Sequence, residues 1–211
     1  MAGEWYSSGM NRPGRPNRKP KNQQSPPRQP NNYAFIDSQN LNLGVQKIGW
    51  KMDWHKFRIW LEQKYGVTHA YMFIGYMAEN ESLYEQMHEH GFLIVLKPTT
   101  EIKAPEVEGQ TEAERDATKP TVKGNIDADL VLHAMKELHN YDKAVIVSGD
   151  GDFFGLIEYL AHEHKLLKIL TPNQRYSTLL KEFDEYIEGL DNHRKELAYH
   201  DRRFSPRKPK N

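Results

Sequence analysis

Short apolar segments alternate with helical patterns along residues 33–199, and this alternation constrains the fold more than any other feature of the chain. Apolar runs typical of buried strands occur at residues 33–36, 67–74, 92–96, 145–147 and 166–170. Helical spacing occupies residues 53–65, 81–90, 126–139, 153–161 and 177–199. Strands that are separated by helices pair mainly in parallel, because each helix crosses one face of the sheet. The sequence therefore predicts an α/β fold with a five-stranded, doubly wound sheet.

The charge of the chain is segregated, although its 29 basic and 29 acidic residues balance. Residues 1–30 carry a net charge of +5 and residues 201–211 carry +4, which leaves −9 on residues 31–200. The two ends cannot bury enough apolar area to fold, so we expect disordered basic tails on either side of one domain. Basic tails of this kind can bind RNA phosphates. In the first tail the basic cluster is Arg12, Arg15, Arg18 and Lys19.

Several classes of protein are excluded by what the sequence lacks. No apolar run approaches the ~20 residues that cross a membrane, and no apolar segment follows the basic start as in a secretory signal. The chain has no cysteine, which excludes disulfide scaffolds and thiolate metal sites. No glycine-rich phosphate loop follows the first strand, so a nucleotide cofactor is not expected. A cytoplasmic protein is the simplest interpretation.

Residues 97–122 interrupt the alternation of strands and helices. They contain three prolines and six acidic residues and show no periodicity, which predicts a long, mobile, acidic loop. Such a loop can be a plain spacer, or it can be a lid that competes with a ligand for the neighbouring crevice. The sequence leaves both readings open.

Aspartates follow two of the expected strands and open one of the expected helices. Asp37 comes directly after the first strand, Asp150 and Asp152 follow the strand at 145–147, and Asp127 stands at the start of a helix. In an open α/β sheet the ligand crevice lies beyond the carboxyl ends of the strands, where the strand order reverses. Oxygen ligands without cysteine suit Mg²⁺ or Mn²⁺. We therefore expect a carboxylate metal centre in this crevice.

Each aspartate also has a purely structural interpretation. Asp152 or Asp127 could cap the helix that it precedes, and Asp150 could serve a glycine-flanked turn. Asp129 falls on the polar stripe of its helix and is expected to be solvated. Asp37 is the hardest of the four crevice candidates to explain by turn chemistry alone.

Three segments together resemble the signatures of the NYN domain, a branch of the PIN-like ribonuclease superfamily, and are most similar to its LabA-like bacterial group. These segments are FIDSQNL at 35–41, KGNIDAD at 123–129 and VSGDGDF at 147–153. The resemblance extends over about residues 31–190. It implies a Rossmann-like, three-layer PIN-like fold and a metal-dependent ribonuclease that leaves a 5′-phosphate and a 3′-hydroxyl.

The resemblance also implies roles for individual residues. Asp37, Asp127, Asp150 and Asp152 take the positions of the catalytic and metal-binding acids, with Asn40 and Ser148 as polar support. Many members carry a second acid on the helix where this chain has His133, the one histidine that we expect near the crevice. This departure keeps a catalytically weak or inactive RNA-binding protein open as the alternative function.

Further residues are candidates for contacts with RNA. Lys123 opens the second signature, and Trp50 lies near the first aspartate loop, where its ring could stack on a base. A phosphatase is disfavoured, because no Asp-x-Asp pair follows the first strand. The sequence thus predicts a Mg²⁺- or Mn²⁺-dependent endoribonuclease with RNA as its partner and no membrane association.

Overall fold

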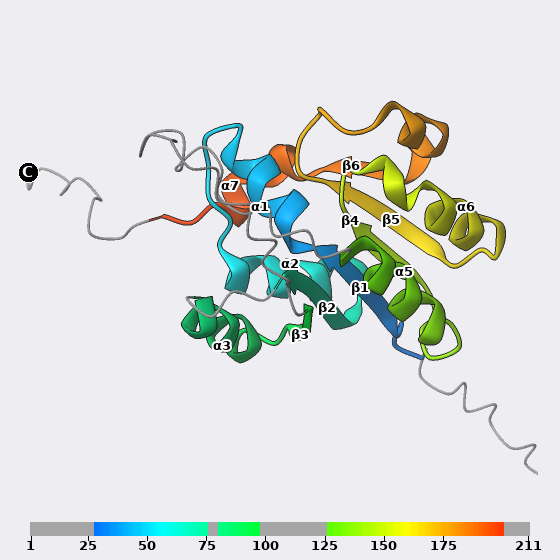
Figure 1. The fold of residues 1–211 in the computed structure, drawn as a ribbon, viewed down its shortest axis with the longest axis horizontal. Coiled ribbons are helices and arrows are strands. Elements are labelled where there is room, and N and C mark those ends of the chain that lie inside the picture. Colours follow the sequence, from blue (N-terminus) through cyan, green and yellow to red (C-terminus); the bar gives the residue numbers. More distant parts are fainter. Residues whose placement is uncertain (1–27, 76–79, 98–125, 201–211) are drawn as a thin grey trace, which may run out of the picture.

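Six parallel strands form one sheet at the centre of the chain (Figure 1), in a computed structural model that describes residues 28–75, 80–97 and 126–200. The strands are β1 (Asn32–Asp37), β2 (Val67–Gly75), β3 (Leu93–Lys97), β4 (Ala144–Val147), β5 (Leu166–Thr171) and β6 (Ile187–Gly189). They lie in the order β3-β2-β1-β4-β5-β6, so the direction of winding reverses between β1 and β4. This point is the expected position of a ligand crevice.

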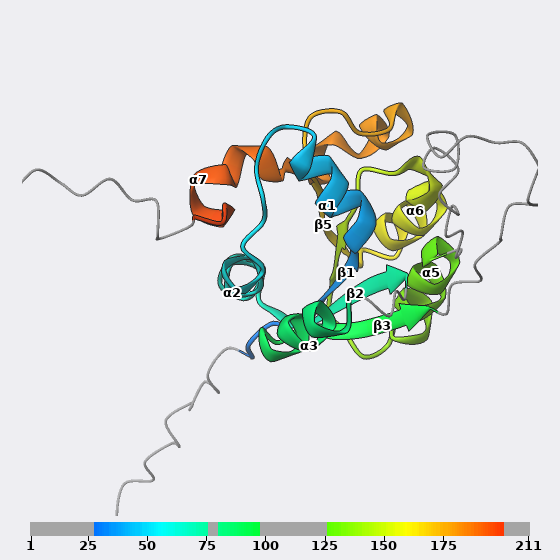
Figure 2. The ribbon, with the colours of Figure 1, turned by 60° about the vertical axis from the view of Figure 1, so that its left-hand side comes forward.

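Helices cover both faces of the sheet, which completes a three-layer fold. The helices are α1 (Ser38–Gln46), α2 (Trp54–Tyr65), α3 (Glu81–Glu89), α5 (Ile126–Lys136), α6 (Phe154–His162) and α7 (Arg194–Leu197). Short 3₁₀ segments are η2 (Gly151–Phe153), η3 (Thr178–Tyr186) and η4 (Leu190–His193). Figure 2 shows α5 and α6 on one side of the sheet and α1, α2 and α7 on the other.

The two apolar layers follow from the alternation of side chains along β1. Ala34 and Ile36 pack into the core on the side of α1 and α2, and Tyr33 and Phe35 pack into the core on the side of α5 and α6. All four side chains are buried, as expected for a central parallel strand whose two faces are both covered. The predicted fold class is therefore confirmed.

The ends of α2 follow from the residues that flank it. Asp53 caps the first turn, because its Oδ1 accepts a hydrogen bond of 3.1 Å from the backbone N–H of Lys56. Gly66 ends the helix in the left-handed conformation at φ +63°, which glycine adopts without a steric penalty. Both ends agree with the sequence prediction.

Two elements differ from the prediction. The sheet has six strands and not five, because residues 187–189 leave the expected C-terminal helix and pair with β5. Helical geometry is already interrupted at Phe183, where φ is −107°. Residues 38–46 form α1 directly after β1, although no helix was expected there. The segment contains a glycine and four amide side chains, so its helical preference is weak, and packing of Leu41 and Val45 in the core holds it.

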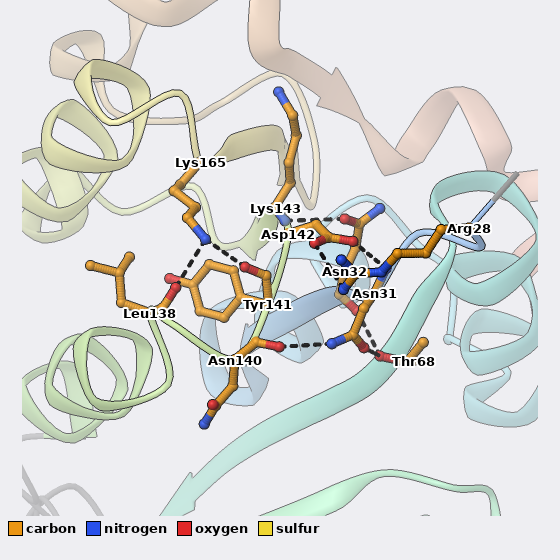
Figure 3. A network of polar contacts seen from close by, with 10 residues as sticks. All are labelled: Arg28, Asn31, Asn32, Thr68, Leu138, Asn140, Tyr141, Asp142, Lys143 and Lys165. Carbon is orange, nitrogen blue, oxygen red and sulfur yellow. Dashed lines mark hydrogen bonds and ion pairs between the residues drawn. The ribbon is translucent and has the colours of Figure 1, made fainter.

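Polar contacts tie the amino-terminal ends of the strands together, on the side opposite to the carboxyl ends (Figure 3). The backbone N–H of Asn31 donates to Asp142 Oδ2 over 2.9 Å, and its side-chain amide donates to the carbonyl of Asn140 over 2.7 Å. Thr68 Oγ1 donates to Asn31 Oδ1 over 2.6 Å, and Arg28 lies 3.5 Å from Asp142. Arg28, which precedes the domain boundary expected at residue 31, thus takes part in these contacts.

None of the helices in the described ranges has the length and apolar character that crossing a bilayer requires. The loop expected over 97–122 lies outside the described residues except for Lys97, and so do residues 1–27 and 201–211 of the expected tails.

Candidate active site

Asp37 occupies the point where β1 passes into α1, next to the reversal in strand order. Its side chain is only 6% exposed. Oδ1 accepts a hydrogen bond of 3.0 Å from the backbone N–H of Asn40, so Asp37 is also the N-cap of α1. Oδ2 accepts a hydrogen bond of 3.2 Å from Ser148 Oγ, which follows β4. The ends of β1 and β4 are thereby joined through this carboxylate.

Asn40 and Ser148 also hold the loop that carries Asp150. The backbone N–H of Gly149 donates to Asn40 Oδ1 over 3.0 Å, and the N–H of Asp150 donates to Ser148 Oγ over 3.1 Å. Asn40 and Ser148 are therefore positioning residues in this structure, in line with the support expected of them.

Asp127 and Asp152 approach from two other elements. Asp127 lies in the first turn of α5 and lines the same cleft as Asp37 and Asp150. Asp152 is exposed and does not line that cleft. Its backbone N–H donates to Asp150 Oδ1 over 3.1 Å, so Asp150, and not Asp152, caps the turn before α6. The capping interpretation of Asp152 was therefore wrong.

The clustered carboxylates disfavour one another's ionisation. The pKa of Asp37 is raised to about 6, mainly by burial and further by the charges of Asp127 and Asp150. The hydrogen bond from Asn40 acts in the opposite direction and lowers this pKa. The pKa of Asp127 is also raised, first by burial and then by Asp150 and Asp152, while Lys97 lowers it. Negative charge thus accumulates in this cleft at a cost to the folded state.

The donor atoms fit a hard divalent cation, although they do not form a closed cage. Within the described ranges, no group of three or more His, Asp or Glu side chains is arranged so that it could hold a metal ion. Mg²⁺ commonly keeps several waters and uses one or two carboxylates together with substrate phosphates, so an open set of oxygens such as Asp37 and Asp150 suits it. A cation would also favour the ionised form of Asp37, whose pKa is raised first by burial and then by the charges of Asp127 and Asp150.

Two cations that the sequence analysis missed line the same cleft, whose volume is about 530 Å³. Lys47 follows the last turn of α1, and Arg175 lies in the loop after β5. That loop is held by Asn173, whose Nδ2 donates to the carbonyl of Gly44 over 2.8 Å and whose Oδ1 accepts from the N–H of Arg175 over 2.8 Å. Among the described ion pairs, neither cation has a carboxylate partner. Arg175 follows the carboxyl end of β5 by four residues, which was a usable signal, whereas Lys47 lies at the far end of α1 and had none.

Asp129 and His133 lie outside the cleft. The side chain of Asp129 is 38% exposed and forms an ion pair of 2.8 Å with Lys97. It was expected to be solvated, and the structure adds this ion pair. His133 packs against Tyr71 with 4.5 Å between ring centroids, and against Phe73 with 5.7 Å. Burial lowers the pKa of His133. The expectation that His133 lies near the crevice was wrong, because the helix directs its ring toward β2.

The structure also corrects the assignment of Trp50 as a base-stacking residue. Its side chain is 6% exposed and belongs to the apolar core on the side of α1 and α2, so its ring faces are not available to a nucleobase. The other expected RNA contacts, Lys123, Arg12, Arg15, Arg18 and Lys19, lie outside the described residues.

Comparison with known proteins identifies the family to which the chain belongs. The family model that describes NYN domains matches residues 33–191 of the sequence, from within β1 to just past β6. This chain belongs to the NYN family. The low amplitude and bright protein LabA of Synechococcus elongatus is 26% identical over 163 residues, covering 74% of this chain and 82% of LabA. The protein is thus a LabA-like NYN protein, in a superfamily whose members are generally nucleases.

A solved structure shares the fold. The crystal structure of a protein of unknown function from Vibrio parahaemolyticus matches 81% of this chain and 98% of its own, with a TM-score of 0.57 and 18% sequence identity. At that identity the likeness concerns the arrangement of the sheet and helices. Two of the three segments that resemble NYN signatures, 35–41 and 147–153, fall where β1 and β4 end, at the reversal in strand order.

Proposed function

We propose that this NYN protein is a Mg²⁺- or Mn²⁺-dependent endoribonuclease that hydrolyses phosphodiester bonds in RNA. The observation that supports it is the sharing of one cleft by three carboxylates and by two cations, Lys47 and Arg175, that form no ion pair with a carboxylate of the described residues. Carboxylates alone would repel a phosphodiester, and cations alone would bind it without activating water. Their combination at the reversal point of an NYN fold suits hydrolysis of a phosphate ester.

Asp37 and Asp150 would hold the cation together with its waters, with Asp127 in the same cleft and Asp152 at its rim. When bound, a divalent cation lowers the pKa of a coordinated water and polarises the phosphate. Because burial opposes the charge on Asp37, this carboxylate gains most from a cation beside it. The proposed ligand set therefore has a physical reason to bind divalent metal at neutral pH.

The remaining cleft residues bind and orient the substrate. Lys47 and Arg175 would contact phosphate oxygens on either side of the scissile bond, and the guanidinium of Arg175 can donate two parallel hydrogen bonds to one phosphate. Asn40 and Ser148 fix the loops that carry Asp37 and Asp150, so the carboxylates keep one spacing during turnover. A fixed arrangement reduces the reorganisation that the reaction would otherwise require.

Cleavage of labelled single-stranded RNA by two matched aspartate variants tests the proposal. Asp150→Asn keeps the shape of the side chain and an oxygen for the N–H of Asp152, so the fold should persist while Mn²⁺-dependent cleavage falls by at least about a hundredfold. Asp129→Asn removes a partly exposed ion pair with Lys97 outside the cleft and should leave cleavage nearly unchanged.

The reactions are run with Mn²⁺ and with a chelator. Loss of activity in Asp129→Asn but not in Asp150→Asn would place the chemistry elsewhere. Binding of RNA by the wild type without cleavage under any metal condition would favour the alternative, an RNA-binding protein without turnover.

A further inference from the structure

A second groove, of about 420 Å³, lies between the connection from α1 to α2 and the segment that contains α7. Its polar walls come from Lys51 in the connection between α1 and α2, from Arg194 and Lys195 in α7, and from Tyr199 and His200 just after α7. We call these five residues the basic groove. Figure 2 shows α7 beside the connection between α1 and α2.

The walls of the basic groove are joined by backbone contacts. The N–H of Tyr199 donates to the carbonyl of Lys51 over 2.9 Å, and Met52 and Ala198 form an antiparallel bridge. Arg194 donates from Nη2 to the carbonyl of Gly49 over 2.8 Å. The groove is therefore a built feature of the fold, since both of its walls are fixed to each other.

One connection of the chain borders both the basic groove and the cleft of the candidate active site. Lys47 and Ile48 line the cleft, and the next three residues, 49–51, line the groove. Lys47 and Lys51 are four residues apart, so their Cα atoms lie within about 14 Å of each other.

The chemistry of the basic groove matches a polyanion. None of the described residues that line it is acidic, although residues 31–200 carry a net charge of −9. Lys51 and Lys195 take part in no ion pair with the described carboxylates. Tyr199 is 56% exposed, so one aromatic ring is available at the groove for stacking on a base. Phosphate-binding cations beside an exposed aromatic ring are typical of single-strand binding surfaces.

We infer that the basic groove binds the single-stranded RNA that extends beyond the scissile phosphate. The inference rests on the proposed ribonuclease function and specifies its substrate: a single strand long enough to occupy the cleft and the groove together. Lys51, Arg194 and Lys195 contact successive phosphates, and Tyr199 stacks on one base. The groove thereby sets the length preference of the enzyme through binding and takes no part in the chemical step.

Binding in the absence of metal tests this inference separately from catalysis. We would measure fluorescence anisotropy of labelled oligouridylates of about 4 and about 12 nucleotides, a range that brackets a single-strand site, with a chelator present. The full-length variant Lys51→Glu/Lys195→Glu should bind the longer oligomer at least about tenfold more weakly. Its salt slope should fall by about 1.4, since two phosphates contribute about 0.7 each. Binding of the short oligomer should change little.

Two comparisons make the result specific. Lys136→Glu/Lys143→Glu introduces the same change of charge with two exposed lysines outside the cleft and the groove, and it should bind both oligomers as the wild type does. Tyr199→Ala removes an exposed ring and should weaken binding of the longer oligomer while its salt slope stays unchanged, because no charge is lost.

The failure of this inference differs from the failure of the proposed function. Equal losses for both oligomers, an equal loss in the control variant, or effective competition by a blunt RNA duplex would each overturn the inference. Binding that depends on length and on Lys51 and Lys195, without cleavage in Mn²⁺, would support the groove and refute the proposed hydrolysis.

Discussion

Replacing Asp37 with asparagine should stabilise the metal-free protein at neutral pH, although it removes a proposed catalytic group. Burial and neighbouring acids raise the pKa of this carboxyl from 3.8 to about 6. One pKa unit corresponds to about 1.4 kcal/mol, so the ionised side chain costs the folded state about 3 kcal/mol at pH 7. Asparagine keeps an oxygen for the N–H of Asn40, and a weakened bond to Ser148 costs about 1 kcal/mol. The net gain is about 2 kcal/mol.

The pH dependence of this gain follows from the direction of the shift. The folded protein binds a proton at Asp37 more tightly than the unfolded chain does, so the stability of the wild type falls as the pH rises from about 4 to about 6. The asparagine variant lacks this loss. Below about pH 4 the variant should therefore be less stable than the wild type by about 1 kcal/mol, which is the cost of the weakened bond to Ser148. The difference should reverse between about pH 4 and pH 6 and remain constant above that range.

Thermal unfolding in a chelator at about pH 4.5 and about pH 7.5 measures the effect. At the higher pH, Asp37→Asn should raise Tm by about 4–8 °C, given about 2–4 °C for each kcal/mol in a domain of this size. Added Mn²⁺ should narrow the difference, because the wild type binds the cation more tightly.

Asp53→Asn provides a matched control, since Asp53 caps α2 as Asp37 caps α1 but lies 3.3 Å from Lys56 Nζ. It should give no gain in Tm, because asparagine caps equally well and a favourable ion pair is lost. A lower Tm for Asp37→Asn at the higher pH, or a difference that does not change with pH, would show that Asp37 is only a helix cap.

Three further predictions test other parts of the molecule. Lys47→Ala/Arg175→Ala should weaken binding of single-stranded RNA and reduce its salt slope by about 1.4 in a metal-free titration; an unchanged slope would remove both cations from the substrate path. Gly66→Ala should destabilise the fold by about 2 kcal/mol, because φ is +63° and a new Cβ would lie 2.6 Å from Cγ of Pro30. The measurement is a fall in Tm of about 4–8 °C, and an unchanged Tm would contradict the left-handed backbone at this residue. Deleting residues 1–27 and 201–211 should weaken RNA binding and reduce its salt dependence, while cleavage at saturating RNA stays intact. Unchanged or tighter binding at low salt would mean that the basic tails instead shield the net negative charge of residues 31–200.

The sequence predicted those parts of the fold that local chemistry determines. Asp53 and Gly66 mark the ends of α2 because a side-chain oxygen and a left-handed backbone are needed there whatever the rest of the fold does. The meeting of Asp37, Asp127 and Asp150 followed from a general rule, that the carboxyl ends of parallel strands share one edge, together with the resemblance to NYN signatures.

The parts that could not be predicted depend on tertiary contacts. Residues 187–189 pair with β5 although the surrounding sequence favours a helix, because an open sheet edge offers hydrogen bonds that local preference does not include. The ring of Trp50 lies in the core, and the ring of His133 packs on Tyr71. Both placements depend on how the backbone of each segment is oriented against the sheet, which the sequence does not show. Lys47 and Arg175 reach one cleft from positions 128 residues apart, which spacing along the chain does not reveal.

The opposing charges of the cleft imply that metal and RNA bind cooperatively in the proposed enzyme. Without a cation, the carboxylates of Asp37, Asp127 and Asp150 repel a phosphodiester and offset the attraction of Lys47 and Arg175. A bound cation removes that repulsion, so each ligand must raise the affinity for the other by the same factor. The carboxylates of the cleft then have a use beyond metal binding, because they weaken the binding of RNA to the cleft until the cation is bound. No acidic residue lines the basic groove among the described residues, so the groove can hold RNA in either state. It supplies affinity, while the cleft supplies the dependence on metal.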